Sequence, residues 1–176
     1  PTAMGVQAAQ PGKLVVNKVN KGFAATCNRG IMSGDSPFVV LLNSDTVVTP
    51  GWLTKMVLAI TADPRNAICN PCTNNTAMIA VPMGEGQTYL DMGRMLGQVG
   101  QPSYPEINPT GFCFMFRRQL IDEIGMLDES FKSYGEETDF WMRALKCASP
   151  EFKHYRAVLA DDAYVFHERG GSFSAL

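Results

Sequence analysis

The run Phe38–Leu42 constrains the fold of this chain more than any other feature, because every residue in it is apolar and the polar residues Asn43, Ser44 and Asp45 follow at once. An unbroken apolar run of this length is typical of a strand that is covered on both faces, as in a parallel sheet. Patterns typical of strands and of helices alternate along the rest of the chain. The sequence therefore predicts a three-layer α/β/α fold built on a mixed, mostly parallel sheet.

The remaining elements are predicted from hydrophobic periodicity and from residues that start or stop helices. Strands are expected at 14–16, 67–69, 111–116, 158–160 and 164–167, and helices at 20–31, 89–96, 118–124 and 136–147. A further helix is expected after Thr49, its capping residue, with Pro50 at the first helical position. The stretch 70–110 is rich in Pro, Gly and Asn, and a loop of that length is usually functional.

Length and composition exclude several classes of protein. The 176 residues are expected to form a single domain, 1–176. The net charge of -2 gives no reason to expect a nucleic-acid partner, and no apolar run in the sequence is long enough to span a bilayer. An odd number of cysteines cannot all pair, which favours a reducing cytoplasm. Cys69 and Cys72 form a lone C-x-x-C, for which core packing is favoured over a metal or redox role.

The segment Asn43-Ser44-Asp45 is the first candidate site. Open α/β sheets bind ligands just beyond the carboxyl ends of their strands, and these residues directly follow a predicted strand. A carboxylate at that position, Asp45, can hold a hard divalent cation through its oxygens. The alternative is that the segment is simply a polar turn between a strand and a helix. The segment alone does not decide between the two.

A second candidate is the acidic cluster Glu136, Glu137 and Asp139, which begins a predicted helix. Acids in the first turn complement the helix dipole, and Asp139 is spaced for an ion pair with Arg143. The functional alternative is that Glu137 is a general base that takes a proton from an attacking hydroxyl. Taken alone, the cluster favours the structural interpretation.

Two further positions carry weaker signals. His167 ends a predicted strand before the flexible pair Gly170-Gly171, and a neutral imidazole there can complete a metal site begun by a carboxylate. A lone histidine is more often a hydrogen-bonded structural residue. Gly22 at a helix start lets the backbone come close to a ligand, and Asn28 either reaches a nucleotide or caps another segment.

Together, these segments resemble the family-two glycosyltransferases with the GT-A (Rossmann-like) fold. The resemblance is closest to the bacterial members that transfer rhamnose or related sugars in cell-surface glycan assembly. The matching segments are NKGFAATCNRGI, PFVVLLNSDTVVTPGWL, GFCFMFRRQLIDEIGMLDESF, YGEETDFWMRA and VFHERGGSF. No single segment is decisive, whereas all of them in the right order and spacing are highly specific.

The resemblance implies a role for each candidate residue. Asn43-Ser44-Asp45 stands at the Asp-x-Asp motif of the family, so Asp45 is the expected ligand of a divalent cation, Mn²⁺ or Mg²⁺. Glu137 stands at the second acid of the family's Glu-Asp pair and is the expected base, with Asp139 in reserve. His167 matches a C-terminal histidine that completes the metal shell. The other implied residues lie in the donor site (Asn43, Ser44, Gly22 and Asn28) and in the acceptor or sugar pocket (Gly111, Glu136 and Trp52).

The implied reaction is the transfer of a sugar, with inversion, from a UDP-, dTDP- or GDP-linked donor to a glycan or lipid-linked acceptor. Catalysis then comes from positioning, from one proton transfer and from stabilisation of the leaving diphosphate. The expected role is in polysaccharide biosynthesis, and the expected location is the cytoplasm, including the inner face of the membrane.

One departure from the family lies at the N-terminus, where the strands that grip the nucleotide in family members are not found. An N-terminally truncated GT-A domain is therefore expected, with an exposed sheet edge that favours self-association. Two alternatives remain open. The chain is a non-catalytic remnant that acts as a binding or interaction module, or it is another nucleotide-dependent enzyme such as a nucleotidyltransferase, which the Gly-Glu-Glu helix start fits poorly.

Overall fold

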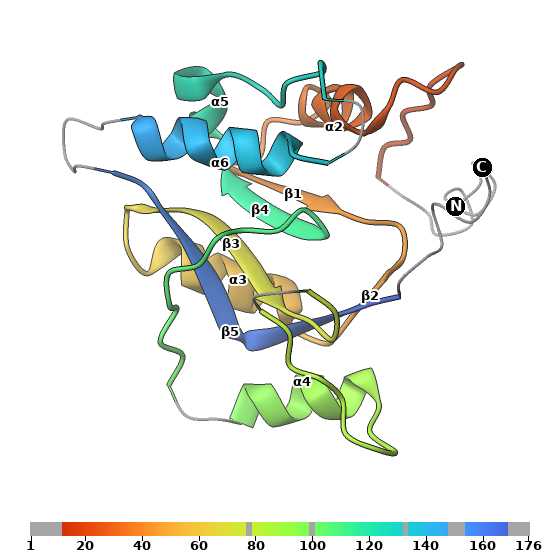
Figure 1. Ribbon diagram of the computed structural model, residues 1–176, viewed down its shortest axis with the longest axis vertical. Helices are drawn as coiled ribbons and strands as arrows, with labels where there is room; N and C mark the ends of the chain where they lie inside the picture. Colours follow the sequence, from red (N-terminus) through yellow and green to blue (C-terminus); the bar gives the residue numbers. More distant parts are fainter. Residues whose placement is uncertain (1–11, 77–78, 99–100, 132–133, 148–153, 169–176) are drawn as a thin grey trace.

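The computed structural model describes residues 12–76, 79–98, 101–131, 134–147 and 154–168 (Figure 1). The helices are α2 (Phe23–Ile31), α3 (Trp52–Thr61), α4 (Tyr89–Gln98), α5 (Gln119–Ile124) and α6 (Glu136–Lys146). The strands are β1 (Phe38–Leu42), β2 (Thr46–Val48), β3 (Asn66–Cys72), β4 (Cys113–Arg117) and β5 (Arg156–His167). Within these residues, no helix has the length and apolar character needed to cross a bilayer.

The strands form one mixed sheet in the order β1-β4-β3-β5-β2. The predicted α/β class with a mixed sheet is confirmed, but the expectation of a mostly parallel sheet is wrong. Among the described strands, β3 and β5 pair in parallel, whereas β1–β4, β3–β4 and β2–β5 are antiparallel. The apolar run Phe38–Leu42 indicated coverage on both faces. In the structure this run forms β1, an outer strand that pairs antiparallel with β4 and on which only Val39 is buried, so an unbroken apolar run establishes neither parallel pairing nor full coverage on both faces.

Helices cover both faces of the sheet, and β4 shows why (Figure 1). Phe114 and Phe116 belong to a core shared with α2, α5 and α6, whereas Cys113 and Met115 belong to a core shared with α3. This alternation follows from the two-residue period of a strand. The Phe140 ring of α6 lies 4.9 Å from the Phe116 ring, centroid to centroid. Burying an aromatic side chain of this kind stabilises the fold by about 2–3 kcal/mol.

Several boundaries differ from the sequence prediction. Residues 14–16 form no strand, 158–160 and 164–167 belong to one strand, β5, and β2 was not expected. Thr49 does not cap α3, because its hydroxyl donates to the Tyr164 carbonyl at 2.6 Å and the residue is buried. Gly51, with φ of 78°, precedes the helix instead, in a left-handed conformation that suits glycine.

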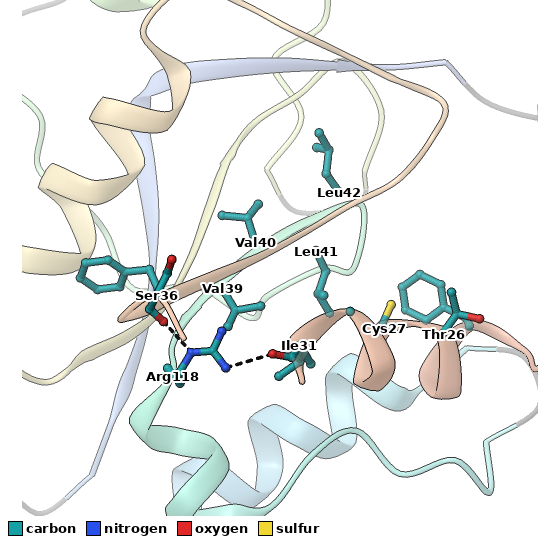
Figure 2. A pocket seen from close by; sticks show the side chains of 12 residues that line it. Thr26, Cys27, Ile31, Ser36, Val39, Val40, Leu41, Leu42 and Arg118 are labelled. Atoms are coloured by element: carbon teal, nitrogen blue, oxygen red, sulfur yellow. Dashed lines mark hydrogen bonds between the residues drawn. The ribbon is translucent and has the colours of Figure 1, made fainter. Parts of the chain in front are cut away.

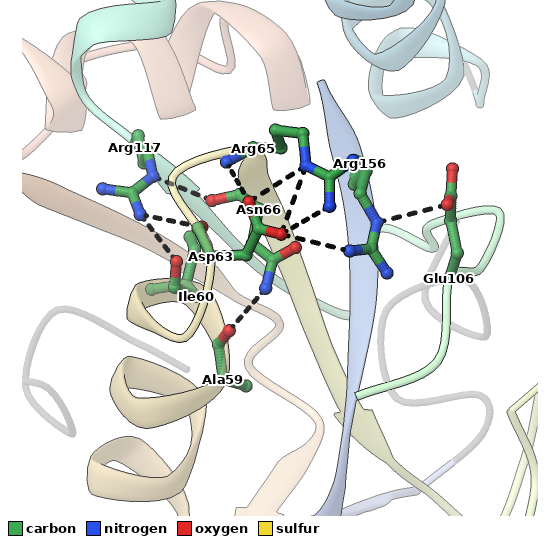
Figure 3. A network of polar contacts seen from close by, with 8 residues as sticks. All are labelled: Ala59, Ile60, Asp63, Arg65, Asn66, Glu106, Arg117 and Arg156. Atoms are coloured by element: carbon green, nitrogen blue, oxygen red, sulfur yellow. Dashed lines mark hydrogen bonds and ion pairs between the residues drawn. The ribbon is translucent and has the colours of Figure 1, made fainter. Parts of the chain in front are cut away.

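A polar network closes the end of the sheet where β3 and β5 begin (Figure 3). Asp63 accepts from the Arg65 guanidinium at 2.6 Å and lies 3.5 Å from that of Arg156. The hydrogen bonds from Arg65 lower the pKa of Asp63 to about 2. Arg117 of β4 donates to the Asn66 carbonyl at 2.8 Å. This network ties three strands together at the end where β1, β3 and β5 start, and it leaves their carboxyl ends for the candidate site.

Candidate functional site

Asp45 and His167 meet because β2 pairs with the end of β5. Thr46 lies opposite His167 in the register, and the Glu168 N–H donates to the Asp45 carbonyl at 2.8 Å. Asp45 Oδ1 then lies 3.4 Å from His167 Nε2. Both side chains are largely buried, at 15% and 18% exposure. In the described part of the chain, Asp45 Oδ1 and His167 Nδ1 are buried without a hydrogen-bond partner.

The Asp45–His167 pair fits a divalent cation. A buried carboxylate oxygen without a partner is costly, and a cation is a natural partner for it. An imidazole nitrogen and a carboxylate oxygen are both ligands of Mn²⁺. Within the described residues, no cluster of three or more His, Cys, Asp or Glu side chains exists. If a cation bound here, the pair would supply two protein ligands, and the rest of a shell would come from water and from ligand phosphates, as is usual for Mg²⁺ in phosphate sites.

The segment Thr110–Cys113 lies between this pair and Glu137. A Cβ added at Gly111 would lie 3.3 Å from Cδ of Glu137, so the carboxyl group sits directly against the glycine. The Phe112 ring stacks on the His167 ring, with centroids 5.3 Å apart and planes at 23°. Two consecutive residues thus contact Glu137 and His167. The predicted residues Asp45, His167, Gly111 and Glu137 are brought together at one end of the sheet.

Glu136 occupies a different position from Glu137. It is buried at 8% exposure, and its charge adds to burial in raising the pKa of the Cys27 thiol to about 12. Glu136 therefore faces α2, while Glu137 is half-buried against Gly111. The turn before them contains Tyr134 and Gly135, both with positive φ, which sets the start of α6. A Cβ at Gly135 would meet the Phe131 ring at 3.0 Å, a tight contact that requires the ring to shift, and φ of 105° itself favours glycine.

Asp139 forms the ion pair that the i, i+4 spacing predicts. Its Oδ2 lies 2.8 Å from Nε of Arg143. Arg143 also donates to the carbonyl groups of Ile124 and Met126, so it links α6 to the end of α5. This arrangement corresponds to the structural interpretation of Asp139.

The other predicted residues lie in different surroundings. Asn28 donates to the Leu127 carbonyl at 2.8 Å and to Glu129 at 3.0 Å, and it accepts from the Leu127 N–H at 3.1 Å. Its side chain therefore caps another segment, which was the second of its two alternatives. Gly22 is exposed with φ of 83° at the start of α2, and Trp52 packs against the core beneath α3.

Within the first candidate segment, the Asn43 N–H donates to the Phe112 carbonyl at 2.9 Å, and Ser44 is exposed. Gly170 and Gly171 lie outside the described residues. Cys69 and Cys72 are buried, and burial raises the pKa of each thiol to about 12. Both thiols are therefore protonated core groups at neutral pH, as the core-packing interpretation expected.

Sequence reasoning missed three residues at the site: Phe112, Asn70 and Asn74. Phe112 lies in an apolar run that indicated only a strand, so its stacking on His167 could not be predicted from the sequence. The two asparagines lie in the stretch that was predicted to be mostly loop. Two amide side chains near the end of a strand were the available signal, because buried amides must find hydrogen-bond partners.

The fold and the site define an α/β protein with a buried Asp45–His167 pair and a further acid, Glu137, at one end of its sheet. The family Glycosyl transferase family 2 matches residues 5–125, so the chain belongs to this family. The matched range ends before Glu137 and His167. The chain is also 26% identical over 163 residues to an uncharacterized glycosyltransferase, YwdF, of Bacillus subtilis, which covers 89% of this chain and 55% of that protein.

Two solved structures share the fold of this chain. One is the mannosyltransferase PcManGT from Pyrobaculum calidifontis in complex with GDP-Man and Mn²⁺, with a TM-score of 0.59 and 15% identity over 92% of this chain and 40% of that chain. The other is GalNAc-T7 with UDP, GalNAc and Mn²⁺, with a TM-score of 0.58 and 14% identity over 86% and 31%. The described fold is therefore that of the GT-A glycosyltransferases. The chain spans about half or less of the length of each of these relatives.

Proposed function

We propose that this chain carries the metal-binding and catalytic site of an inverting glycosyltransferase that uses a nucleotide-sugar donor. The observation that carries the proposal is the pair Asp45 and His167, 3.4 Å apart with a buried carboxylate oxygen that lacks a hydrogen-bond partner. The dipeptide Gly111–Phe112 separates this pair from a second acid, Glu137, because Gly111 lies against the Glu137 carboxyl group and Phe112 stacks on His167. Membership of glycosyl transferase family 2 supports this reading, as do the GDP-Man, UDP and Mn²⁺ in the complexes of the two structural relatives.

Asp45 and His167 would hold a divalent cation, Mn²⁺ or Mg²⁺. When bound, the cation neutralises the charge that develops on the leaving diphosphate. Glu137 accepts the proton of the acceptor hydroxyl as its oxygen bonds to the anomeric carbon. The bond from that carbon to the diphosphate oxygen breaks in the same step, so the configuration inverts. Gly111 leaves room for the Glu137 carboxyl group at the start of β4.

Glu137 is preferred over Asp139 as the base because of what each carboxylate contacts. Asp139 is held by the Arg143 guanidinium at 2.8 Å, and Arg143 also bonds to carbonyl groups at the end of α5 and just after it. Glu137 lies against Gly111, and the next residue, Phe112, stacks on the His167 ring. A base has to lie within hydrogen-bonding reach of the acceptor, and the position of Glu137 beside the metal-binding pair supports that geometry.

The proposal is tested by donor turnover with the 176-residue chain. GDP-, UDP- and dTDP-linked sugars are incubated with Mn²⁺ or Mg²⁺, and release of the nucleoside diphosphate is followed together with the anomeric configuration of the product. We expect release from at least one donor, loss of release with EDTA and recovery on adding Mn²⁺. Metal-independent turnover would contradict the proposed site. Metal-dependent nucleotide binding by calorimetry without any turnover would support the non-catalytic alternative instead.

We also propose that the chain self-associates through the edge of β1. Within the described sheet, β1 is an outer strand. The Asn43 N–H and the Pro37 carbonyl face β4, so strand alternation turns the N–H and C=O of Val40 outward. Beside this edge lies a pocket of about 430 Å³ between α2 and β1, closed at one end by hydrogen bonds from Arg118 to Ser36 and Ile31 (Figure 2). An open strand next to an apolar hollow favours pairing with a second copy.

Replacing Leu42 with lysine is expected to weaken this association. Leu42 is 43% exposed on β1, and a charge on an edge strand opposes strand pairing. The matched control is Leu58→Lys, the same change at an exposed position of α3. Sedimentation velocity over a range of concentrations should show dimers in the wild type and in Leu58→Lys, and monomers in Leu42→Lys. A wild-type chain that stays monomeric at all concentrations would rule the interface out.

A further inference from the structure

Asn74 holds the main chain of His167 through both ends of its side-chain amide. Its Nδ2 group donates to the His167 carbonyl at 3.1 Å, and the His167 N–H donates to Asn74 Oδ1 at 2.7 Å. The register between β3 and β5 ends at Cys72 and Tyr164, before His167 is reached. The amide of Asn74 therefore replaces the backbone partner that a longer β3 would have supplied.

The pairing with β2 explains why His167 needs this partner. The Glu168 N–H bonds to the Asp45 carbonyl, so Asp45 and Glu168 form the hydrogen-bonded pair of that antiparallel ladder. Neighbouring residues in such a ladder alternate in direction, which turns the N–H and C=O of His167 away from β2 and toward Asn74. With both backbone groups held, the direction in which the imidazole leaves the strand is fixed.

Asn70 makes a corresponding set of hydrogen bonds to the turn that contains Phe112. It is fully buried, and its Nδ2 group donates to the carbonyl groups of Thr110 at 2.8 Å and Cys113 at 2.6 Å. The Thr110 N–H donates to Asn70 Oδ1 at 3.0 Å. Both ends of the turn are thus fixed by one side chain. Between them lies the Phe112 ring, which stacks on His167.

We propose that Asn70 and Asn74 are positioning residues that together fix the His167 imidazole beside Asp45. Asn74 acts through the main chain of His167, and Asn70 acts through the Phe112 ring. Both come from β3 or the turn just after it, so the central strand of the sheet sets the geometry of the metal-binding pair. The inference rests on the proposed function in one respect only, the assignment of His167 as a metal ligand.

The test observes His167 directly. The chain has only two histidines, and His154 is exposed, so imidazole NMR spectra of the ¹⁵N-labelled chain resolve His167 with an internal reference. Mn²⁺ is titrated into wild type, Asn74→Ala and Asn70→Ala, and broadening of the His167 signals reports occupancy. Loss of a group that orients a metal ligand typically costs 10–100-fold in metal affinity. We expect an apparent Kd for Mn²⁺ raised by at least about 10-fold in each variant.

The matched control is Asn66→Ala, which removes the other buried asparagine of β3. Asn66 donates to the Ala59 carbonyl at 2.9 Å within the network at the other end of the strand (Figure 3). It should lower thermal stability without changing the Mn²⁺ affinity. In metal-free protein, Asn70→Ala should also shift the ring-proton signals of His167, because the stacked Phe112 ring moves.

The outcomes separate this inference from the proposed function. Failure of Mn²⁺ to broaden His167 in the wild type would remove the metal site and, with it, the premise of the inference. Wild-type affinity in both Asn70→Ala and Asn74→Ala would overturn the inference alone. An equal loss of affinity in Asn66→Ala would also overturn it, because the effect would then follow from general destabilisation rather than from the position of His167.

Discussion

Replacing Glu137 with glutamine is expected to lower the rate constant of sugar transfer by about 10²–10⁴-fold, the usual contribution of a positioned general base. Glutamine keeps the size of the side chain and its contact with Gly111, but its amide cannot take up a proton. Donor binding should stay within about twofold of wild type, because Asp45 and His167 lie on the other side of the Gly111–Phe112 dipeptide. Steady-state measurement of kcat and KM separates the two effects.

Asp139→Asn is the matched control for this prediction. It makes the same chemical change two residues along the same helix, but it removes an ion pair with Arg143 whose partners are 28% and 29% exposed. Such a pair contributes up to about 1 kcal/mol of stability, so the control should unfold at a slightly lower temperature with kcat little changed. Equal turnover in wild type and Glu137→Gln would sink the assignment of the base. A collapse of kcat in Asp139→Asn would transfer the role to Asp139.

The sequence predicted the position of the candidate site better than the details of the sheet. The segment Asn43-Ser44-Asp45 was placed at a strand end, and β1 ends at Leu42 as expected. His167 was expected at the end of a later strand, and it is the last residue of β5. Local patterns suffice for such predictions, because apolar periodicity and a following polar residue mark where a strand stops.

Strand direction and strand pairing did not follow from local pattern. The short strand β2, Thr46–Val48, was not predicted, although its pairing with β5 is what brings Asp45 to His167. Three residues do not establish a period, and their pairing with residues more than a hundred positions away depends on the whole fold. Thr49 failed as a cap for a related reason, since a carbonyl from distant Tyr164 takes its hydroxyl.

The hydrogen bonds that Asn70 and Asn74 make at the site could not be predicted from local sequence either. Their hydrogen-bond partners lie 40 and 93 residues away in the chain. A polar residue near a strand end has many possible partners before the fold is known, so the sequence indicates only that an amide buried there must be satisfied. For Asn28 the sequence left nucleotide binding and capping open, and its hydrogen bond to the Leu127 carbonyl, 99 residues away in the chain, shows that the side chain caps that segment.

Replacing Asp45 with asparagine is expected to weaken Mn²⁺ binding by about 100-fold or more, since it removes the only negative charge of the Asp45–His167 pair. The amide has nearly the same size, so the β2–β5 pairing should persist. Titration of Mn²⁺ against the His167 imidazole signals measures the affinity, and metal-dependent turnover should fall with it. An Asp45→Asn variant that binds Mn²⁺ as the wild type does would show that the cation, if present, is held elsewhere.

The same substitution is expected to have the opposite effect on the stability of the metal-free fold. Asp45 Oδ1 is buried without a hydrogen-bond partner, and His167 Nε2 lies 3.4 Å from it, so in the absence of a cation the folded state bears the cost of a poorly satisfied carboxylate. A neutral amide reduces that cost, and Tm measured in EDTA should equal or exceed the wild-type value. Added Mn²⁺ should raise Tm in the wild type much more than in Asp45→Asn, because a ligand stabilises only the state that binds it. A carboxylate kept at a position where it lowers the stability of the empty fold is what a metal-binding role predicts and a polar-turn role does not.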